Sequence, residues 1–220
     1  MRAGAGAGAG RPHAAAEQVG PRARLGAAGV LVAILAFASV LGAAVGTEGT
    51  AYDWWNNMLS DLGDPSCHVR GGRWICSPGA AAFNAGLVTT GGILLASALL
   101  LVVPWGRVLS GGVAVMGGGL VIAGVFPAGD DGAVHLAGVV LALVVPGLAL
   151  LAASVRPETV WLSRGRVLRG ALAVVALLLC AESRLPQALL PRGAAEVVIV
   201  AALLVALGWE AARVVGARQR

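Results

Sequence analysis

The amino-acid sequence predicts an all-α membrane protein, a polytopic bundle of six transmembrane helices. The chain of 220 residues has a mean hydropathy of +0.83, and 58% of its residues are hydrophobic while only 12% are charged. This composition is far from that of a soluble globular domain. Long apolar stretches recur along the chain, and arginines gather between particular stretches. These observations together indicate membrane-spanning helices with a defined orientation.

Each apolar stretch has about the length that a transmembrane helix needs. A helix rises about 1.5 Å per residue and the hydrocarbon core is about 30 Å thick. The fifth stretch is unusual because Glu182 and Arg184 interrupt it. The predicted spans are 25–46, 80–104, 108–126, 133–155, 170–190 and 194–212.

The segments outside the spans are short, apart from one loop. Residues 1–24, with their Ala-Gly repeats, predict a disordered cytoplasmic tail, and residues 213–220 a basic cytoplasmic tail. The apolar run that follows the first tail is about 20 residues long. A retained helix is therefore expected rather than a signal peptide, whose apolar region has roughly 7–15 residues. Residues 47–79 form the long extracytoplasmic loop.

The arginines predict the orientation. With the N-terminus in the cytoplasm, twelve of the sixteen arginines fall on the cytoplasmic side, and only Arg70, Arg73, Arg184 and Arg192 fall on the other. This asymmetry follows the positive-inside rule and predicts a multi-pass protein of the cell membrane with both termini in the cytoplasm. The net charge of +5 does not indicate nucleic acid, because the arginines flank apolar spans, where anionic membrane lipid accounts for them.

The extracytoplasmic loop contains aromatic residues and two cysteines. Trp54 and Trp55 are of the kind that settles at the level of lipid headgroups. Cys67 and Cys76 predict a disulfide, because thiols outside the cytoplasm are usually oxidised. The alternative is a zinc site with His68, although adjacent Cys67 and His68 are poorly spaced for one tetrahedral ion. Cys180, within the fifth span, is expected to be a small core residue.

Short motifs in a fixed order resemble those of DUF998, a family of bacterial and archaeal membrane proteins. They are Ser60-Asp61-Leu62-Gly63, Phe83-Asn84-Ala85-Gly86, Gly124-Val125-Phe126-Pro127, His135 and the weaker Arg184-Leu185. The resemblance covers the chain from about residue 25 onward, and the segment between the two cysteines departs from it. It implies a six-span fold and an orientation. It implies no activity, because the family is one of unknown function.

Two outer loops carry carboxylates and imidazoles that are candidates for chemistry. These residues are Asp61, Asp64 and His68 in the first loop, and Asp130, Asp131 and His135 in the second and at the start of the next span. If the loops meet, the residues could hold a divalent metal ion, with His68, His135, Asp61 and Asp64 as ligands, or act as general acid and base. Alternatively, they are solvated charges and helix caps. Haem is not expected, since His68 lies on a loop.

Glu182 and Arg184 are further catalytic candidates. If the fifth span runs over 170–190, they lie about 9–12 Å below its outer end by helical rise and form a buried pair, with Asn84 as a hydrogen-bonding neighbour. Alternatively the helix ends at Ala181, and both charges lie in a wet loop. We predict that Asp61, His135 and Arg184 converge at the outer mouth of the bundle, because a buried charge needs a partner.

Two classes of function follow. The first is an outer-leaflet enzyme or binding protein for a lipid or isoprenoid, with an acidic and histidine-bearing pocket. In it, Asp61, Asp64, His135, Glu182 and Arg184 are the catalytic candidates. The candidates for binding the substrate are Asn84, Trp54, Trp55, Asp130 and Asp131. The second class is a transporter or an accessory subunit that contacts a membrane protein partner.

Overall fold

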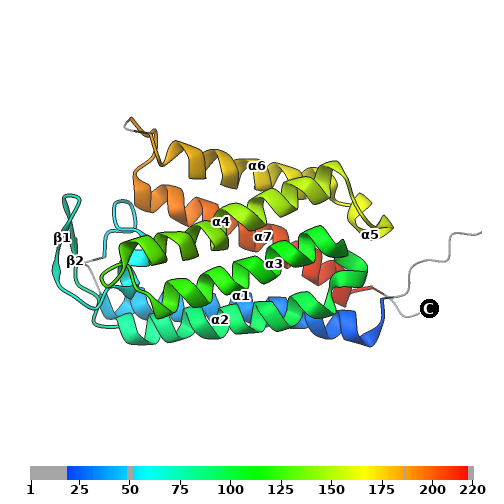
Figure 1. Ribbon diagram of the computed structural model, residues 1–220, viewed down its shortest axis with the longest axis horizontal. Coiled ribbons are helices and arrows are strands. Elements are labelled where there is room, and N and C mark those ends of the chain that lie inside the picture. Colours follow the sequence, from blue (N-terminus) through cyan, green and yellow to red (C-terminus); the bar gives the residue numbers. More distant parts are fainter. Residues whose placement is uncertain (1–18, 49–51, 186, 218–220) are drawn as a thin grey trace, which may run out of the picture.

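The computed structural model of the protein describes residues 19–48, 52–185 and 187–217 (Figure 1). These residues form seven α-helices, one 3-10 helix and one two-stranded antiparallel hairpin, so the all-α prediction is confirmed. The elements are α1 (Pro21–Glu48), η2 (Leu59–Gly63), β1 (His68–Arg70), β2 (Arg73–Ile75), α2 (Ala80–Leu100), α3 (Val102–Val125), α4 (Gly132–Val155), α5 (Val160–Ser163), α6 (Arg166–Glu182) and α7 (Arg192–Val215).

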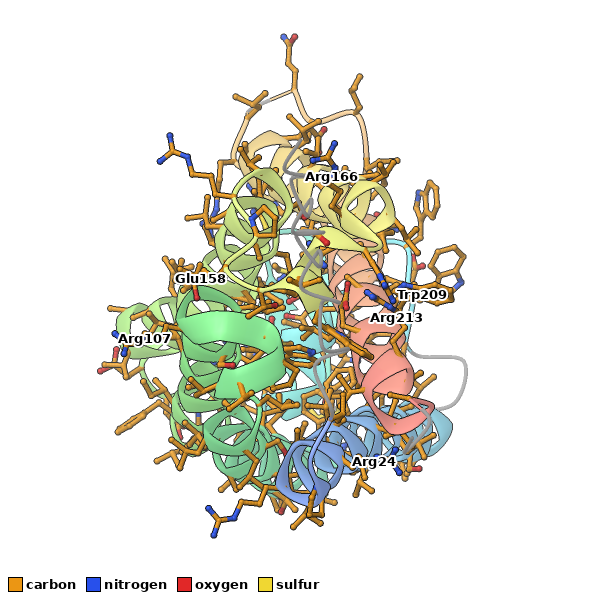
Figure 2. The ribbon with its side chains drawn as sticks, turned by 90° about the vertical axis from the view of Figure 1, so that its right-hand side faces the viewer. Arg24, Arg107, Glu158, Arg166, Trp209 and Arg213 are labelled. Atoms are coloured by element: carbon orange, nitrogen blue, oxygen red, sulfur yellow. A yellow bond between two sulfur atoms is a disulfide. The ribbon has the colours of Figure 1, made fainter. Side chains whose placement is uncertain are left out.

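The six long helices form a ring in chain order. Each packs against the next, α1 on α2, α2 on α3, α3 on α4, α4 on α6 and α6 on α7, and contacts between α1 and α7 close the ring. Figure 1 shows the hairpin and η2 together at one end of the bundle, the hairpin end. The turn between α2 and α3, helix α5 and the start of α1 lie at the other end, the basic end, which faces the viewer in Figure 2.

Five helices are long and apolar enough to cross a membrane, namely α1, α2, α3, α4 and α7. Helix α6 differs from the prediction, because it covers Arg166–Glu182 rather than 170–190. It begins directly after Gly165, which has a φ of 76° and turns the chain, and a proline at position 186 disfavours helix in the residue before it. The prediction of a buried Glu182–Arg184 pair within a span is therefore wrong, because both residues lie at or beyond the end of the helix.

The other helix boundaries differ less from the prediction. Helix α1 begins at Pro21, inside the tail predicted to be disordered to residue 24, and proline is favoured at a first helical position. Residues 1–18 of that tail and residues 218–220 lie outside the described residues. Helix α3 is interrupted at Gly106, whose φ is 69°. This break lies between the predicted spans 80–104 and 108–126. The Glu158 carboxylate accepts hydrogen bonds from the backbone N–H groups of Arg107 and Val108, so it caps the longer part of α3.

The basic end contains a buried ion pair that the sequence did not predict. Arg169 on α6 and Glu210 on α7 are both fully buried, and their Nη1 and Oε1 atoms are 2.5 Å apart. Arg169 also donates to the Ser154 hydroxyl at 3.1 Å and to the backbone carbonyls of Ala153 and Leu162 at 2.9 and 2.7 Å. The second oxygen of Glu210 accepts from Arg213, 2.8 Å away. This network joins α4, α6 and α7.

Glycines set the spacing between neighbouring helices in the ring. A Cβ atom on Gly119 of α3 would lie 2.5 Å from the backbone nitrogen of Ala142 and 2.6 Å from the backbone oxygen of Gly138, both on α4. Backbone atoms cannot move aside as a flexible side chain can. In contrast, a Cβ on the adjacent Gly118 would meet nothing within 4 Å. The close contact between α3 and α4 therefore depends on Gly119.

The Gly119→Ala variant should accordingly be less stable than the wild type by about 1–3 kcal/mol, because α3 and α4 must separate to accept the methyl group. Gly118→Ala is the matched control. It should be neutral or more stable by up to about 1 kcal/mol, since alanine favours helix. Thermal unfolding of the detergent-purified proteins measures both, and equal melting temperatures for the two variants would contradict this packing.

Candidate functional site

The hairpin end is assembled around the predicted disulfide, which is confirmed: Cys67 and Cys76 are bonded. Between them, β1 and β2 pair with Val69 opposite Trp74 and Arg70 opposite Arg73. The turn is formed by Gly71 and Gly72, whose φ values of 56° and 81° suit glycine. The disulfide and the turn together hold Arg70 and Arg73 on a short, closed segment at the hairpin end of the bundle.

Each of these arginines binds an aspartate. Arg73 donates to both carboxylate oxygens of Asp61, from Nε at 2.7 Å and from Nη2 at 3.0 Å. This fork-like contact raises the pKa of Arg73. Asp61 is 2% exposed and also accepts from the Met58 backbone N–H at 2.9 Å. The sequence predicted that Arg184 pairs with a carboxylate, either Glu182 or Asp61; in the structure Asp61 pairs with Arg73 instead.

Asp64 binds the other arginine, Arg70. It is fully buried and accepts from Arg70 Nη2 at 2.6 Å and from the hydroxyl and backbone N–H of Ser66 at 2.6 and 3.0 Å, with His68 Nε2 at 3.7 Å. Burial alone would raise the pKa of Asp64. The hydrogen bonds from Ser66 and the charges of Arg70 and His68 outweigh burial and lower it. Asp64 and His68 thus organise the hairpin.

Beneath the hairpin lies a cavity of about 980 Å³, bounded by η2, the hairpin, α4, α6 and α7. The residues of its mouth are polar and mostly charged: Ser60, Asp61, Arg70, Arg73, His135, Arg184, Arg192 and Glu196. Its deeper wall is apolar and consists mainly of Leu136, Val139, Val140, Leu143, Val144, Leu177 and Ile199. The three residues predicted to converge, Asp61, His135 and Arg184, all line this cavity.

The cavity exists because α4 and α6 diverge toward the hairpin end, as Figure 1 shows. Nearer the basic end the two helices are close, since a Cβ on Gly147 would lie 3.0 Å from the Leu177 side chain and one on Gly170 would lie 3.3 Å from Ser154. Toward the hairpin end, Leu136 and Val140 of α4 remain 42% and 38% exposed. The apolar wall of the cavity is therefore open at the side of the bundle.

The mouth keeps a net positive charge even when the Glu196 carboxylate, which also lines it, is counted. The charges of Arg73 and Arg70 are matched by Asp61 and Asp64. Among the ion pairs of the described residues, none includes Arg184 or Arg192. Arg192 is also the first residue of α7, where the helix dipole is positive. These two arginines are free to bind an anion.

His135 lines the cavity and leaves one ring nitrogen without a hydrogen-bond partner among the described residues. It lies in the first turn of α4 and is 8% exposed. Its Nδ1 is 2.9 Å from the Phe126 carbonyl oxygen, whereas Nε2 is buried and has no hydrogen-bond partner among the described residues. His135 also lines a smaller cavity of about 60 Å³, which it shares with Asn84 and Glu196.

Glu196 belongs to the site although the sequence did not single it out. It lies in α7, is 7% exposed, lines both cavities and accepts from the Leu59 backbone N–H at 2.6 Å. It thereby ties η2 to α7. A carboxylate four residues after Arg192, within an otherwise apolar span, was the available signal. Arg73 and Arg192 were also missed, because loop arginines were interpreted only as markers of orientation.

Several sequence candidates do not line the large cavity. Glu182 accepts from the backbone N–H groups of Leu189 and Leu190 and does not pair with Arg184. Asp131 caps α4 by accepting from Ala133 and Val134, each at 3.1 Å. The other positions are as follows: Asp130 is exposed, Asn84 donates to the Gly63 carbonyl at 2.8 Å, and Trp54 and Trp55 are exposed and stack edge to face with ring centres 5.3 Å apart.

The described residues contain no group of three histidine, cysteine or acidic side chains placed to hold a metal ion. The candidate ligands separate into two sets, since Asp64 and His68 serve the hairpin while Asp61 and His135 line the cavity. What the cavity combines instead is guanidinium groups at its mouth and aliphatic side chains below. This arrangement can bind a molecule that is anionic at one end and apolar at the other.

No curated protein and no solved structure matches the chain. A family model described as "Protein of unknown function (DUF998)" matches residues 30–213, which includes η2, the hairpin, all of α2, α3, α4 and α6 and most of α1 and α7. The motifs around Asp61, His135 and Arg184 lie within the matched region and meet at one cavity. The chain therefore belongs to the DUF998 family of membrane proteins.

Proposed function

We propose that the protein binds a membrane amphiphile with an anionic headgroup, a lipid or an isoprenoid, in the cavity at the hairpin end. The observation that supports this proposal is the division of the cavity into a cationic mouth and an apolar wall. In the proposal, Arg184 and Arg192 bind the headgroup, while Asp61 fixes Arg73 beside it. The lipid- or isoprenoid-handling activity, binding or enzymatic, would take place there.

The dimensions and the opening of the cavity support a lipid rather than a small soluble anion. Ligand pockets commonly measure about 300–1,000 Å³, and this cavity, at about 980 Å³, lies at the upper limit. A phosphate or sulfate ion would occupy only its mouth. The apolar wall opens between α4 and α6, on the side of the bundle that hydrocarbon chains would cover. A chain could reach the wall from the bilayer while its headgroup stays at the mouth.

The proposal includes six spans, with the hairpin end outside the cell and both termini in the cytoplasm. Helix α6 has 17 residues, about 25 Å by helical rise, and it packs between two helices that are long enough to cross. The described arginines at the basic end outnumber those at the hairpin end. The described arginines at the basic end are Arg22, Arg24, Arg107, Arg156, Arg164, Arg166, Arg169 and Arg213, several of which are labelled in Figure 2. This asymmetry and the disulfide support the orientation.

A transporter, the alternative function, is less well supported by the packing. A transport path would have to continue from the cavity to the basic end. There the interior is filled by large, fully buried side chains such as Trp105, Leu150 and Leu203, and by the Arg169–Glu210 pair. The cavity of about 410 Å³ at the basic end shares no lining residue with the large one.

The test measures binding of dioleoyl phosphatidylethanol, which carries one negative charge, against zwitterionic dioleoyl phosphatidylcholine. Native mass spectrometry of the detergent-purified protein should show a preference for the anionic lipid. The double variant Arg184→Gln/Arg192→Gln should weaken that binding at least tenfold, because hydrogen bonds to charged groups contribute about 1.5–3 kcal/mol each and 1.4 kcal/mol is a factor of ten.

The matched control is Arg156→Gln/Arg166→Gln, which removes two equally exposed arginines from the basic end. It should leave binding within about twofold of the wild type. Equal affinity for the two lipids, or an equal loss in both double variants, would refute a headgroup site at the hairpin end.

A further inference from the structure

The contacts of His135, which lines the cavity, fix its hydrogen-bonding role. Its Nδ1 is 2.9 Å from a carbonyl oxygen, that of Phe126. A carbonyl oxygen only accepts hydrogen bonds, so Nδ1 carries the ring hydrogen and donates it. In the neutral imidazole Nε2 is then a bare acceptor. This acceptor is buried, and no donor among the described residues reaches it.

The mouth also contains the carboxylates of Asp61 and Glu196, which already accept hydrogen bonds from Arg73 and from the Leu59 backbone N–H, and its arginines present donors. Arg184 and Arg192 offer only N–H groups, and these suit the acceptor oxygens of a phosphate. In the neutral ring, His135 Nε2 cannot bind such an ionised oxygen, because two acceptors repel. A headgroup that satisfies both parts of the mouth must therefore bring acceptors to the arginines and a hydrogen-bond donor to His135.

We infer that the preferred ligand is an anionic lipid whose headgroup also carries a hydroxyl group, and that His135 selects it by accepting a hydrogen bond from that hydroxyl at Nε2. This inference rests on the proposed function and adds a specificity-determining residue to it. A hydroxyl is favoured over an ammonium as the donor, because Arg184 and Arg192 together outweigh the charge of Glu196 and repel a cation at the mouth. Leaving a buried acceptor unpaired is unfavourable, so a lipid without a donor should bind less well.

Two lipids of equal charge test this inference. Dioleoyl phosphatidylglycerol and dioleoyl phosphatidylethanol both carry one negative phosphodiester, and only the first has headgroup hydroxyls. In competition, monitored by native mass spectrometry, the wild type should prefer phosphatidylglycerol by about fivefold, the effect of one hydrogen bond. Dioleoyl phosphatidylethanolamine, which donates from an ammonium group, should bind more weakly than either. Soluble glycerol 1-phosphate should not displace the lipid.

The variants assign the preference to His135. His135→Phe removes the acceptor and keeps a ring, so it should bind both anionic lipids with about equal affinity. His135→Gln restores an acceptor oxygen and should recover part of the preference. The Arg184→Gln/Arg192→Gln variant should bind both anionic lipids more weakly than the wild type does.

The possible failures are distinguishable. Equal binding of phosphatidylglycerol and phosphatidylethanol by the wild type, or a preference that survives in His135→Phe, overturns the role of His135 and leaves the proposed anionic-lipid site in place. Preferential binding of phosphatidylethanolamine overturns the choice of a hydroxyl. Absence of any preference for anionic lipid over phosphatidylcholine overturns both proposals. If His135→Phe does not fold, two measurements decide the question: the ratio of the affinities for phosphatidylglycerol and phosphatidylethanol in the wild type, and the change of that ratio in His135→Gln.

Discussion

Glu210→Leu should lower the free energy of unfolding by about 3–5 kcal/mol, the cost of leaving a buried charge without its partner. Arg169 is fully buried and would keep only neutral acceptors, the Ser154 hydroxyl and the carbonyls of Ala153 and Leu162. Thermal or denaturant unfolding in detergent measures the effect. Because the pair joins α6 to α7 far from the cavity, lipid affinity of the folded fraction should not change.

The double variant Arg169→Met/Glu210→Leu separates charge from packing. Replacing both members of a buried ion pair by apolar residues of similar size is often neutral or stabilising, so the double variant should recover most of the stability lost in Glu210→Leu. If the single variant is as stable as the wild type, or if the double variant is less stable than the single one, the pair is not buried as described.

Loss of the disulfide should have the second largest effect. The Cys67→Ser/Cys76→Ser variant should lose about 2–3 kcal/mol of local stability, the entropy of closing a loop of this length. The closed segment holds Arg70 and Arg73 on their aspartates. Hydrogen exchange should therefore increase over residues 68–75, and affinity for phosphatidylethanol should fall. Cys180→Ser, which removes the free thiol, is the control and should change neither.

The same cysteines test the orientation. In intact cells, a membrane-impermeant reductant followed by an impermeant maleimide should label Cys67 and Cys76 and leave Cys180 unlabelled. Labelling that appears only after the cells are permeabilised would place the hairpin end in the cytoplasm. The lipid would then belong to the inner leaflet.

The fold was largely predictable because apolar length is a strong signal. Helices α1, α2, α3, α4 and α7 follow from runs of apolar residues, with boundaries shifted by a few positions. Helix α6 was placed wrongly because hydropathy does not distinguish a helix from an apolar loop. The helix ends at Glu182, but apolar residues such as Leu189 and Leu190 continue in the loop that follows. The prediction joined helix and loop into one span.

The site was predictable only in part, for a different physical reason. The sequence indicated that Asp61, His135 and Arg184 would meet, and they line one cavity. Their partners depend on contacts between residues far apart in the chain. Arg73 reaches Asp61 because the hairpin folds back, and Glu196 reaches Leu59 across 137 positions. The helix-capping interpretation of Asp131 required only local spacing, and the structure shows that cap.

The divergence of α4 and α6 gives the cavity a mechanical property. The outermost of the close contacts between these helices, Gly147 against Leu177, acts as a fulcrum, and the part of α6 from Leu177 to Glu182 is a lever arm about 7.5 Å long by helical rise. A tilt of roughly 10° about this fulcrum moves the Glu182 end by about 1.3 Å, close to the rise of one helical residue. The width of the opening thus depends on the angle of α6 between α4 and α7, and a small change in this angle suits the opening to ligands of different girth.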